Sequence, residues 1–312
     1  MTAKVTMPPA TTERCRLLLQ RWRQDLRLTR REQGLLRGEL TLLDRQLQRL
    51  EHNVLRLAVF GRVGVGKSSL INALVGQRLL ETDVAHGSTR RQQAVTWPLK
   101  LDGLQRVELI DTPGIDEIDA AGRTRLATRV AMGVDLVLLV IDSDLTRCDR
   151  DALETLQASG KPVRLVLNRS DRWPEEQLPE LLDSIRSRLP SDLPLTAVAA
   201  APRQPMLDAD GRVRSSAAPA RVSNLKQQLI DQFQREGELL LALQSLRLAD
   251  RFQQQRQHLR LQQHRRSAQG LIGRYAATKA TAVAVNPLMG LDLAGGLALS
   301  LIHISEPTRP VP

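Results

Sequence analysis

Residues 55–76 read LRLAVFGRVGVGKSSLINALVG, and this stretch decides the fold. The apolar run 55–60 has the length of a short buried strand, and residues 61–68, GRVGVGKS, fit the pattern GxxxxGKS. Apolar residues at helical spacing follow. A strand, a glycine-rich turn and a helix, in this order, are the context in which the pattern forms a phosphate-binding loop.

Each residue type in this loop has a physical role toward a phosphate group. Glycines let backbone N–H groups converge on phosphate oxygens, and the start of the following helix adds a partial positive charge. The ammonium of Lys67 would bridge phosphate oxygens in catalysis, while the hydroxyl of Ser68 would bind Mg²⁺. We therefore expect the loop to contact a nucleotide through Gly61, Val63, Gly64, Val65, Gly66, Lys67, Ser68 and Ser69.

A second motif ends the apolar strand expected at 107–110. Asp111-Thr112-Pro113-Gly114 fits D-x-x-G and begins 43 residues after Ser68 (111 − 68). A carboxylate at this strand end can hold Mg²⁺ through water, and the backbone N–H of Gly114 can sense the terminal phosphate, which makes Gly114 a candidate catalytic group. Taken alone, DTPG is also ordinary β-turn chemistry.

A third motif, Asn168-Arg169-Ser170-Asp171, ends the strand expected at 163–167. It fits the guanine-specifying pattern N-K-x-D, with Arg in place of Lys. The carboxylate of Asp171 can accept two hydrogen bonds from guanine, whereas adenine offers no such pair of donors. Arg169 could lie over the base, and the backbone N–H of Ala200 is expected to approach the guanine oxygen. Taken alone, the motif would favour a polar cap between strand and helix.

Short apolar runs alternate with longer amphipathic stretches through the middle of the chain, which is typical of an α/β domain with a mostly parallel sheet. We expect this phosphate-loop domain to span 54–201, with helices on both sides of the sheet. Its strands are predicted at 55–60, 93–99, 107–110, 136–141, 163–167 and 195–199. The Pro-, Ala- and Ser-containing stretch 202–222 is expected to be a linker.

Helical segments are expected on both sides of this domain. Leucines spaced three or four residues apart predict an amphipathic helical arm at 1–53, with a break near Gly34 and Gly38, and a second helical segment at 223–275. Residues 276–302 are apolar but interrupted by polar residues and proline, which fits either a membrane-seated hairpin or a buried helix pair. Residues 303–312 follow no earlier pattern and are expected to be a non-native tail.

The charge balance and the cysteine content limit the possible environments. Lys and Arg outnumber Asp and Glu by 45 to 34, which favours anionic partners such as nucleic acid, anionic lipid or phosphates. The two cysteines, Cys15 and Cys148, have no metal-ligand spacing, so neither a zinc site nor a disulfide framework is supported. We expect a cytoplasmic compartment, with peripheral or integral attachment to the inner face of the cell membrane as a further expectation.

The three motifs, in this order and each at a strand end, resemble the G domain of Era-like and dynamin-related bacterial GTPases. The resemblance includes GVGKSSLINAL from Gly64 to Leu74. It implies GTP and GDP as ligands and a catalytic threonine of the first switch loop that closes on Mg²⁺ and the γ-phosphate. Thr89 is the best candidate for this threonine and Thr82 the second, so the implied metal ligands are Ser68, Thr89 and Asp111.

The same resemblance implies slow hydrolysis of GTP. Ile115 follows DTPG at the position where Ras-like proteins carry the glutamine that orients the attacking water. A hydrophobic residue there implies low turnover that is raised by dimerisation, a partner or an ion.

Three roles for such a switch stay open. The apolar segment 276–302 is similar to one that follows the G domain in membrane-associated bacterial GTPases, which favours a switch at an anionic membrane surface. An RNA- or ribosome-associated assembly GTPase is the first alternative, although 2% aromatic content argues against base stacking on nucleic acid. A nucleotide-dependent scaffold or homodimer, built on the leucine-rich helices, is the second. In a simpler interpretation, the flanking helices only pack on each other beside the G domain.

Overall fold

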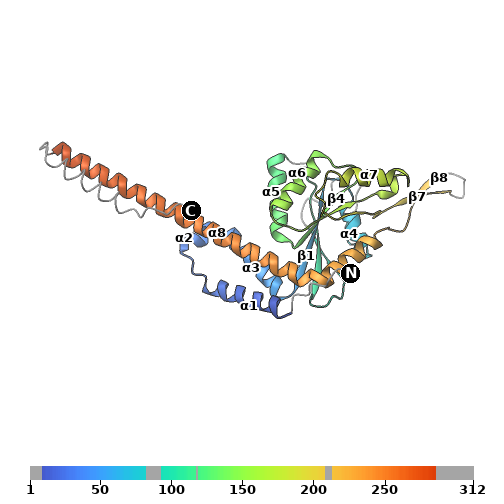
Figure 1. Ribbon diagram of the computed structural model, residues 1–312, viewed down its shortest axis with the longest axis horizontal. Helices are drawn as coiled ribbons and strands as arrows, with labels where there is room; N and C mark the ends of the chain where they lie inside the picture. The colour runs from blue at the N-terminus through green and yellow to red at the C-terminus, as the bar shows by residue number, and fades with distance from the viewer. Residues whose placement is uncertain (1–8, 82–92, 117–118, 208–212, 286–312) are drawn as a thin grey trace. The chain divides into compact units, whose positions relative to one another are not determined.

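The computed structural model describes residues 9–81, 93–116, 119–207 and 213–285 (Figure 1). It divides into two compact units, residues 1–252 and residues 253–312. The first unit contains both sheets, whereas the described part of the second is the continuation of one long helix.

The main sheet has six strands in the order β2-β3-β1-β4-β5-β6, and every neighbouring pair is parallel except β2 with β3. The strands are β1 (Val54–Gly61), β2 (Gln93–Trp97), β3 (Arg106–Asp111), β4 (Leu136–Ile141), β5 (Val163–Leu167) and β6 (Leu195–Ala197). The predicted fold class is thereby confirmed. Strand β2 ends two residues earlier than predicted because Pro98 has no N–H to donate to the ladder.

Helices cover both faces of this sheet. Helix α4 (Lys67–Val75) and the first part of α8 (Ser223–Val285) pack on one face, and α5 (Ala120–Gly133), α6 (Arg147–Ala158) and α7 (Gln177–Arg186) pack on the other. Residues of β4 alternate between the two cores, with Leu138 in the first and Leu139 in the second. A central strand buried on both faces explains the uninterrupted apolar run of β4.

The amino-terminal arm consists of α1 (Pro9–Asp25), α2 (Arg30–Leu35) and α3 (Arg37–Glu51). The break between α2 and α3 falls at Leu36, between the two glycines expected to weaken the helix. A second interruption, at 26–29, ends in Thr29, whose side chain and that of Glu32 form a capping box. The buried residues Leu43, Leu47 and Leu50 show that the arm is part of the folded unit.

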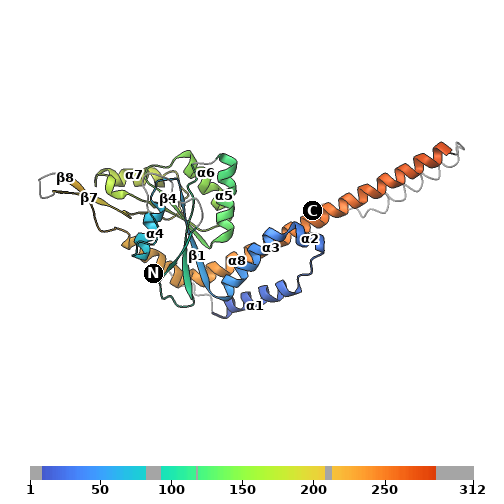
Figure 2. The ribbon, with the colours of Figure 1, turned by 180° about the vertical axis from the view of Figure 1, so that it is seen from behind.

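A buried polar junction ties the arm to the sheet and to α8. Arg49 Nη1 lies 2.5 Å from Asp135 Oδ2, which also accepts the backbone N–H of Arg56 at 2.8 Å. Gln46 Nε2 donates to Ser245 Oγ at 3.1 Å. Helix α3 runs beside the first part of α8 in both views (Figure 1, Figure 2). Within residues 1–252, the structure therefore favours the interpretation in which the flanking helices pack on each other beside the G domain.

The expected linker differs from the structure. Residues 202–222 contain β7 (Arg203–Leu207) and β8 (Val213–Ala217), which pair antiparallel as a separate two-stranded sheet. Both strands lack an alternating apolar pattern, and Pro205 lies inside the first, so the usual strand signals are absent.

The long helix α8 extends ten residues beyond the predicted boundary, to Val285 rather than residue 275 (285 − 275). Of the predicted apolar segment 276–302, residues 276–285 are helical, and the rest lies outside the described residues, as does the tail 303–312. Among the described helices, none is both long and apolar enough to cross a membrane.

Candidate nucleotide site

The three motifs come together at the carboxyl edge of the main sheet. The phosphate loop follows β1, DTPG follows β3 and the Asn168 motif follows β5, while Asp142 follows β4 between them. In open parallel sheets, ligands bind at this edge. The sequence motifs therefore mark one site and not three.

The phosphate loop requires glycine where the backbone approaches its neighbours. Gly61 has φ 150°, and a Cβ there would overlap the carbonyl oxygen of Val140. Gly66 has φ 89°, and a Cβ there would overlap the side-chain amide of Asn168. At both positions a side chain is excluded by conformation and by space.

Lys67 and the start of α4 form the base of the loop. The Lys67 ammonium donates to the carbonyl oxygens of Gly61 at 3.1 Å and Arg62 at 2.7 Å, and the residue is 7% exposed. Helix α4 begins at Lys67, so its first N–H groups lie at the loop. The lysine charge and the helix start thus lie together, which is an arrangement suited to an anion.

The predicted metal ligands from two motifs are in contact. Ser68 Oγ donates to Asp111 Oδ2 at 2.6 Å, and Asp111 is 1% exposed at the end of β3. Mg²⁺ takes oxygen ligands and usually keeps waters and substrate phosphates, so a hydroxyl and one carboxylate fit it. The described residues contain no group of three His, Cys, Asp or Glu side chains able to hold a metal alone. Thr89 and Thr82 lie outside the described residues.

The DTPG loop lies against the phosphate loop at Val63. The backbone N–H of Val63 donates to Asp116 Oδ1 at 2.6 Å, and a Cβ on Gly114 would overlap the Val63 side chain. Ile115, between them, is 0% exposed and belongs to the same core cluster as Phe60. The residue after DTPG is therefore part of the core, and its side chain offers no polar group for orienting water.

Asn168 links the third motif to its neighbours. Its Nδ2 donates to the carbonyl oxygen of Val65 at 2.9 Å, and its Oδ1 accepts the N–H of Ala200 at 3.0 Å. The sequence predicts that this N–H faces the base, whereas the structure directs it to Asn168, because the buried amide oxygen needs a donor. Asp171 lies in the short helix η1 (Ser170–Arg172) and is half-buried.

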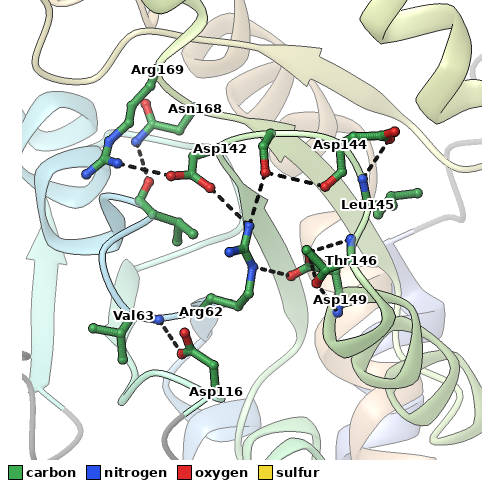
Figure 3. A network of polar contacts seen from close by, with 12 residues as sticks. Arg62, Val63, Asp116, Asp142, Asp144, Leu145, Thr146, Asp149, Asn168 and Arg169 are labelled. Carbon is green, nitrogen blue, oxygen red and sulfur yellow. Dashed lines mark hydrogen bonds and ion pairs between the residues drawn. The ribbon is translucent and has the colours of Figure 1, made fainter.

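A charged network that the sequence did not predict joins the phosphate loop to the third motif (Figure 3). Arg169, in the left-handed conformation at φ 59°, donates from Nη1 to Asp142 Oδ2 at 3.0 Å. The other oxygen of Asp142 accepts from Arg62 Nη2 at 3.0 Å, and Arg62 Nε donates to Asp149 at 3.2 Å. The Arg that replaces the usual Lys therefore has a specific carboxylate partner.

The network rests on the start of α6. Asp149 is 0% exposed and forms a capping box with Thr146. Burial opposes the charge of Arg62, but Asp149 and Asp142 outweigh burial and raise the pKa of this guanidinium. Burial, followed by Arg172, lowers the pKa of Arg169. The signal that could have revealed the network is Asp142, a carboxylate directly after an apolar strand that neighbours the third motif.

Comparisons with known proteins agree with this geometry. Residues 56–169 match the family described as 50S ribosome-binding GTPase, and residues 247–306 match a domain of unknown function (DUF697). GTPase Der of Rhizobium johnstonii is 43% identical over 121 residues, which are 37% of this chain and 25% of that protein. GTPase Era of Synechocystis sp. is 37% identical over 132 residues, 40% of each chain.

The chain thus spans 25–40% of the length of these curated relatives. Among solved structures, Era of Aquifex aeolicus bound to GDP and aluminium fluoride has a TM-score of 0.46 and 22% identity, covering 57% of this chain and 56% of that one. On the sequence matches and the site geometry, the region 56–169 is a P-loop GTPase G domain of the Era and Der type.

Proposed function

We propose that this chain binds GTP and GDP together with Mg²⁺ and hydrolyses GTP as a slow, conditionally activated switch. The observation that carries the proposal is the contact of Ser68 Oγ with Asp111 Oδ2 at 2.6 Å, beside the ammonium of Lys67. Residues from two motifs thereby form one oxygen site at an anion-binding helix start. Bound Mg²⁺ would neutralise negative charge on the phosphates.

The chain's own groups divide the work. Lys67 and the first N–H groups of α4 bind phosphate oxygens, and Ser68 and Asp111 hold the metal, with Thr89 proposed as a third metal ligand. Asp171 selects guanine, and Gly114 reports the terminal phosphate through its N–H. Burial of Ile115 supports slow turnover, because the side chain after DTPG cannot orient water.

The first test is competition of GTP, GDP and ATP for the protein with Mg²⁺ present. Lys67→Ala should weaken GTP binding by about a hundredfold, because it removes a charged donor from a buried site. Lys100→Ala is the matched control, since Lys100 is exposed. Unchanged GTP affinity in the Lys67 variant would contradict the assignment of the phosphate loop.

Two further variants distinguish binding of the metal from recognition of the base. Ser68→Ala should raise the Mg²⁺ concentration needed for GTP binding, measured by titration of the metal at fixed nucleotide. Asp171→Asn should reduce GTP affinity by about tenfold and leave ATP affinity unchanged, because only guanine offers the donor pair. A loss of both nucleotides in parallel would show that Asp171 supports the loop instead of selecting the base.

For the place where the switch acts, we propose an anionic membrane surface at the inner face of the cell membrane. The net charge of +11 supports the proposal. So do the apolar side chains exposed on the described part of residues 253–312, which are Leu261, Leu271, Ile272 and Tyr275. Sedimentation with anionic liposomes, with and without residues 276–312, tests it. Loss of sedimentation on truncation, with GTP binding intact, supports membrane attachment through that segment.

A ribosome-associated role is the alternative, and the description of the matched family as a 50S ribosome-binding GTPase favours it. Sedimentation with 50S subunits in GTP and in GDP, in the same buffer as the liposome assay, discriminates between the two partners. GTP-dependent binding to 50S subunits and none to liposomes would replace the membrane proposal. A scaffold built on paired helices is less favoured, because apolar residues of α3 and α8 are already buried within residues 1–252.

A further inference from the structure

A basic cavity lies at the edge of the sheet opposite the nucleotide site. It has a volume of about 60 Å³ and is lined by the carboxyl end of α5, the turn before β5 and the first part of α8. Its lining residues are Ala131, Met132, Ser159, Lys161, Gln244, Arg247, Leu248 and Arg251. Three of them are cationic and none is acidic, so the cavity is suited to an anion.

Gln244 provides an independent sign of a ligand. Gln244 is 2% exposed, and its Oε1 accepts a hydrogen bond from the Lys161 ammonium. Its Nε2 is buried and has no hydrogen-bond partner among the described residues. A buried amide donor without a partner costs about 1–3 kcal/mol, and Gln244 is one of the residues that line the cavity.

The cations around Gln244 keep unused donors. Lys161 Nζ donates to the carbonyl oxygen of Val134 at 2.9 Å and to Gln244, which leaves one of its three protons. Arg247 donates from Nη1 to the carbonyl oxygen of Gly160, and its remaining guanidinium N–H groups are further donors. The hydrogen bond to Val134 at the end of α5 gives Lys161 a structural role. It explains neither the buried amide nor the two arginines.

We propose that this cavity binds a phosphate group, either free or as the headgroup of a phosphomonoester lipid. A phosphate dianion offers more acceptor oxygens and more charge than a carboxylate, which matches an amide, an ammonium and two guanidinium groups. Val134 and Lys161 precede β4 and β5, whereas the phosphate loop follows the end of β1. The site is therefore separate from the nucleotide phosphates.

The test uses the full chain saturated with Mg²⁺ and GDP, so that the phosphate loop is occupied, and titrates inorganic phosphate by calorimetry. Saturable binding is expected. Arg247→Gln with Arg251→Gln should weaken it by about tenfold or more, because both variants keep a polar side chain but lose the charge. Arg235→Gln, on the same helix and exposed, is the matched control and should bind phosphate as the native chain does.

Vesicles distinguish the two sources of phosphate. Sedimentation is compared on phosphatidylcholine vesicles that contain either phosphatidic acid or an equal charge of phosphatidylserine. Preference for phosphatidic acid that the double arginine variant loses assigns the lipid headgroup, whereas binding of inorganic phosphate without that preference assigns free phosphate. If neither ligand binds, or if the double variant binds both as the native chain does, the proposal is overturned. GDP affinity, measured in the same samples, tests the nucleotide site separately.

Discussion

Two arginine–aspartate networks lie at the two ends of the same strand, β4. Asp135 precedes the strand, and its side chain is 0% exposed beside Arg49, which is 8% exposed. Asp142 follows the strand, is 20% exposed and binds both Arg62 and Arg169. Strand β4 thus has a polar network that is buried from solvent, here called closed, at its amino end. At its carboxyl end it has a partly solvent-exposed network, here called open.

The difference between the two networks is one of function as well as burial. The Asp135 junction joins the arm, the sheet and α8, and a buried pair with satisfied hydrogen bonds fixes how these elements dock. The Asp142 network joins two loops that would contact a nucleotide. Because this network is partly solvated, each of its ion pairs contributes less to stability than the Asp135 pair does. Its main effect is to hold the two loops in a fixed position relative to each other.

The largest effect is expected at the closed end. Asp135→Ala should lower the free energy of unfolding by about 3–5 kcal/mol, because Arg49 would keep a buried charge without its partner. Urea unfolding followed by circular dichroism measures this change. The matched control is Asp183→Ala in the exposed pair with Arg186, which should cost at most about 1 kcal/mol. Equal losses in the two variants would remove the distinction between closed and open networks.

An intermediate effect is expected at the open end. Asp142→Ala should weaken GTP and ITP binding equally, by about tenfold or ~1.4 kcal/mol, because the loops lose register while Asp171 still reads the base. Nucleotide competition measures this change. Asp144→Ala is the control, since the half-exposed side chain of Asp144 pairs with Arg188, and its contact to the network is through its backbone carbonyl oxygen. Loss of GTP affinity alone, with ITP binding unchanged, would show instead that Asp142 acts on recognition of the exocyclic amine of guanine.

The smallest effect is expected from pH, again at the closed end. Burial lowers the pKa of Lys161 from 10.5 to about 8, against attraction by Asp135 and with repulsion from Arg49 and Arg247. Between these pKa values the unfolded chain binds a proton that the folded chain does not, so stability rises with pH. From pH 8 to pH 9 the rise should be about 1 kcal/mol in phosphate-free buffer.

Lys161→Met should remove this part of the pH dependence, which is measured as the difference between the two proteins in urea unfolding at each pH. A difference that stays constant from pH 8 to pH 9 would show that Lys161 titrates outside this range.

The sequence by itself determined the local features of this protein. Contiguous patterns predict the strands of the main sheet, the phosphate loop and the positions of Lys67, Ser68 and Asp111. Hydrophobic periodicity, glycine positions and strand ends can each be recognised within a few residues. Strand order then brings Ser68 to Asp111. The hairpin of β7 and β8 escaped prediction because its strands carry no apolar alternation.

Only the tertiary structure decided which distant charges pair. Arg62 and Asp142 are 80 residues apart, and Arg49 and Asp135 are 86 apart, so their contacts depend on strand order and on where helices dock. The same holds for Gln244 Nε2, which has no hydrogen-bond partner among the described residues. The whole fold determines which polar side chains are buried and which partners they have, so the motifs of the candidate site could be located in the sequence but the networks around them could not.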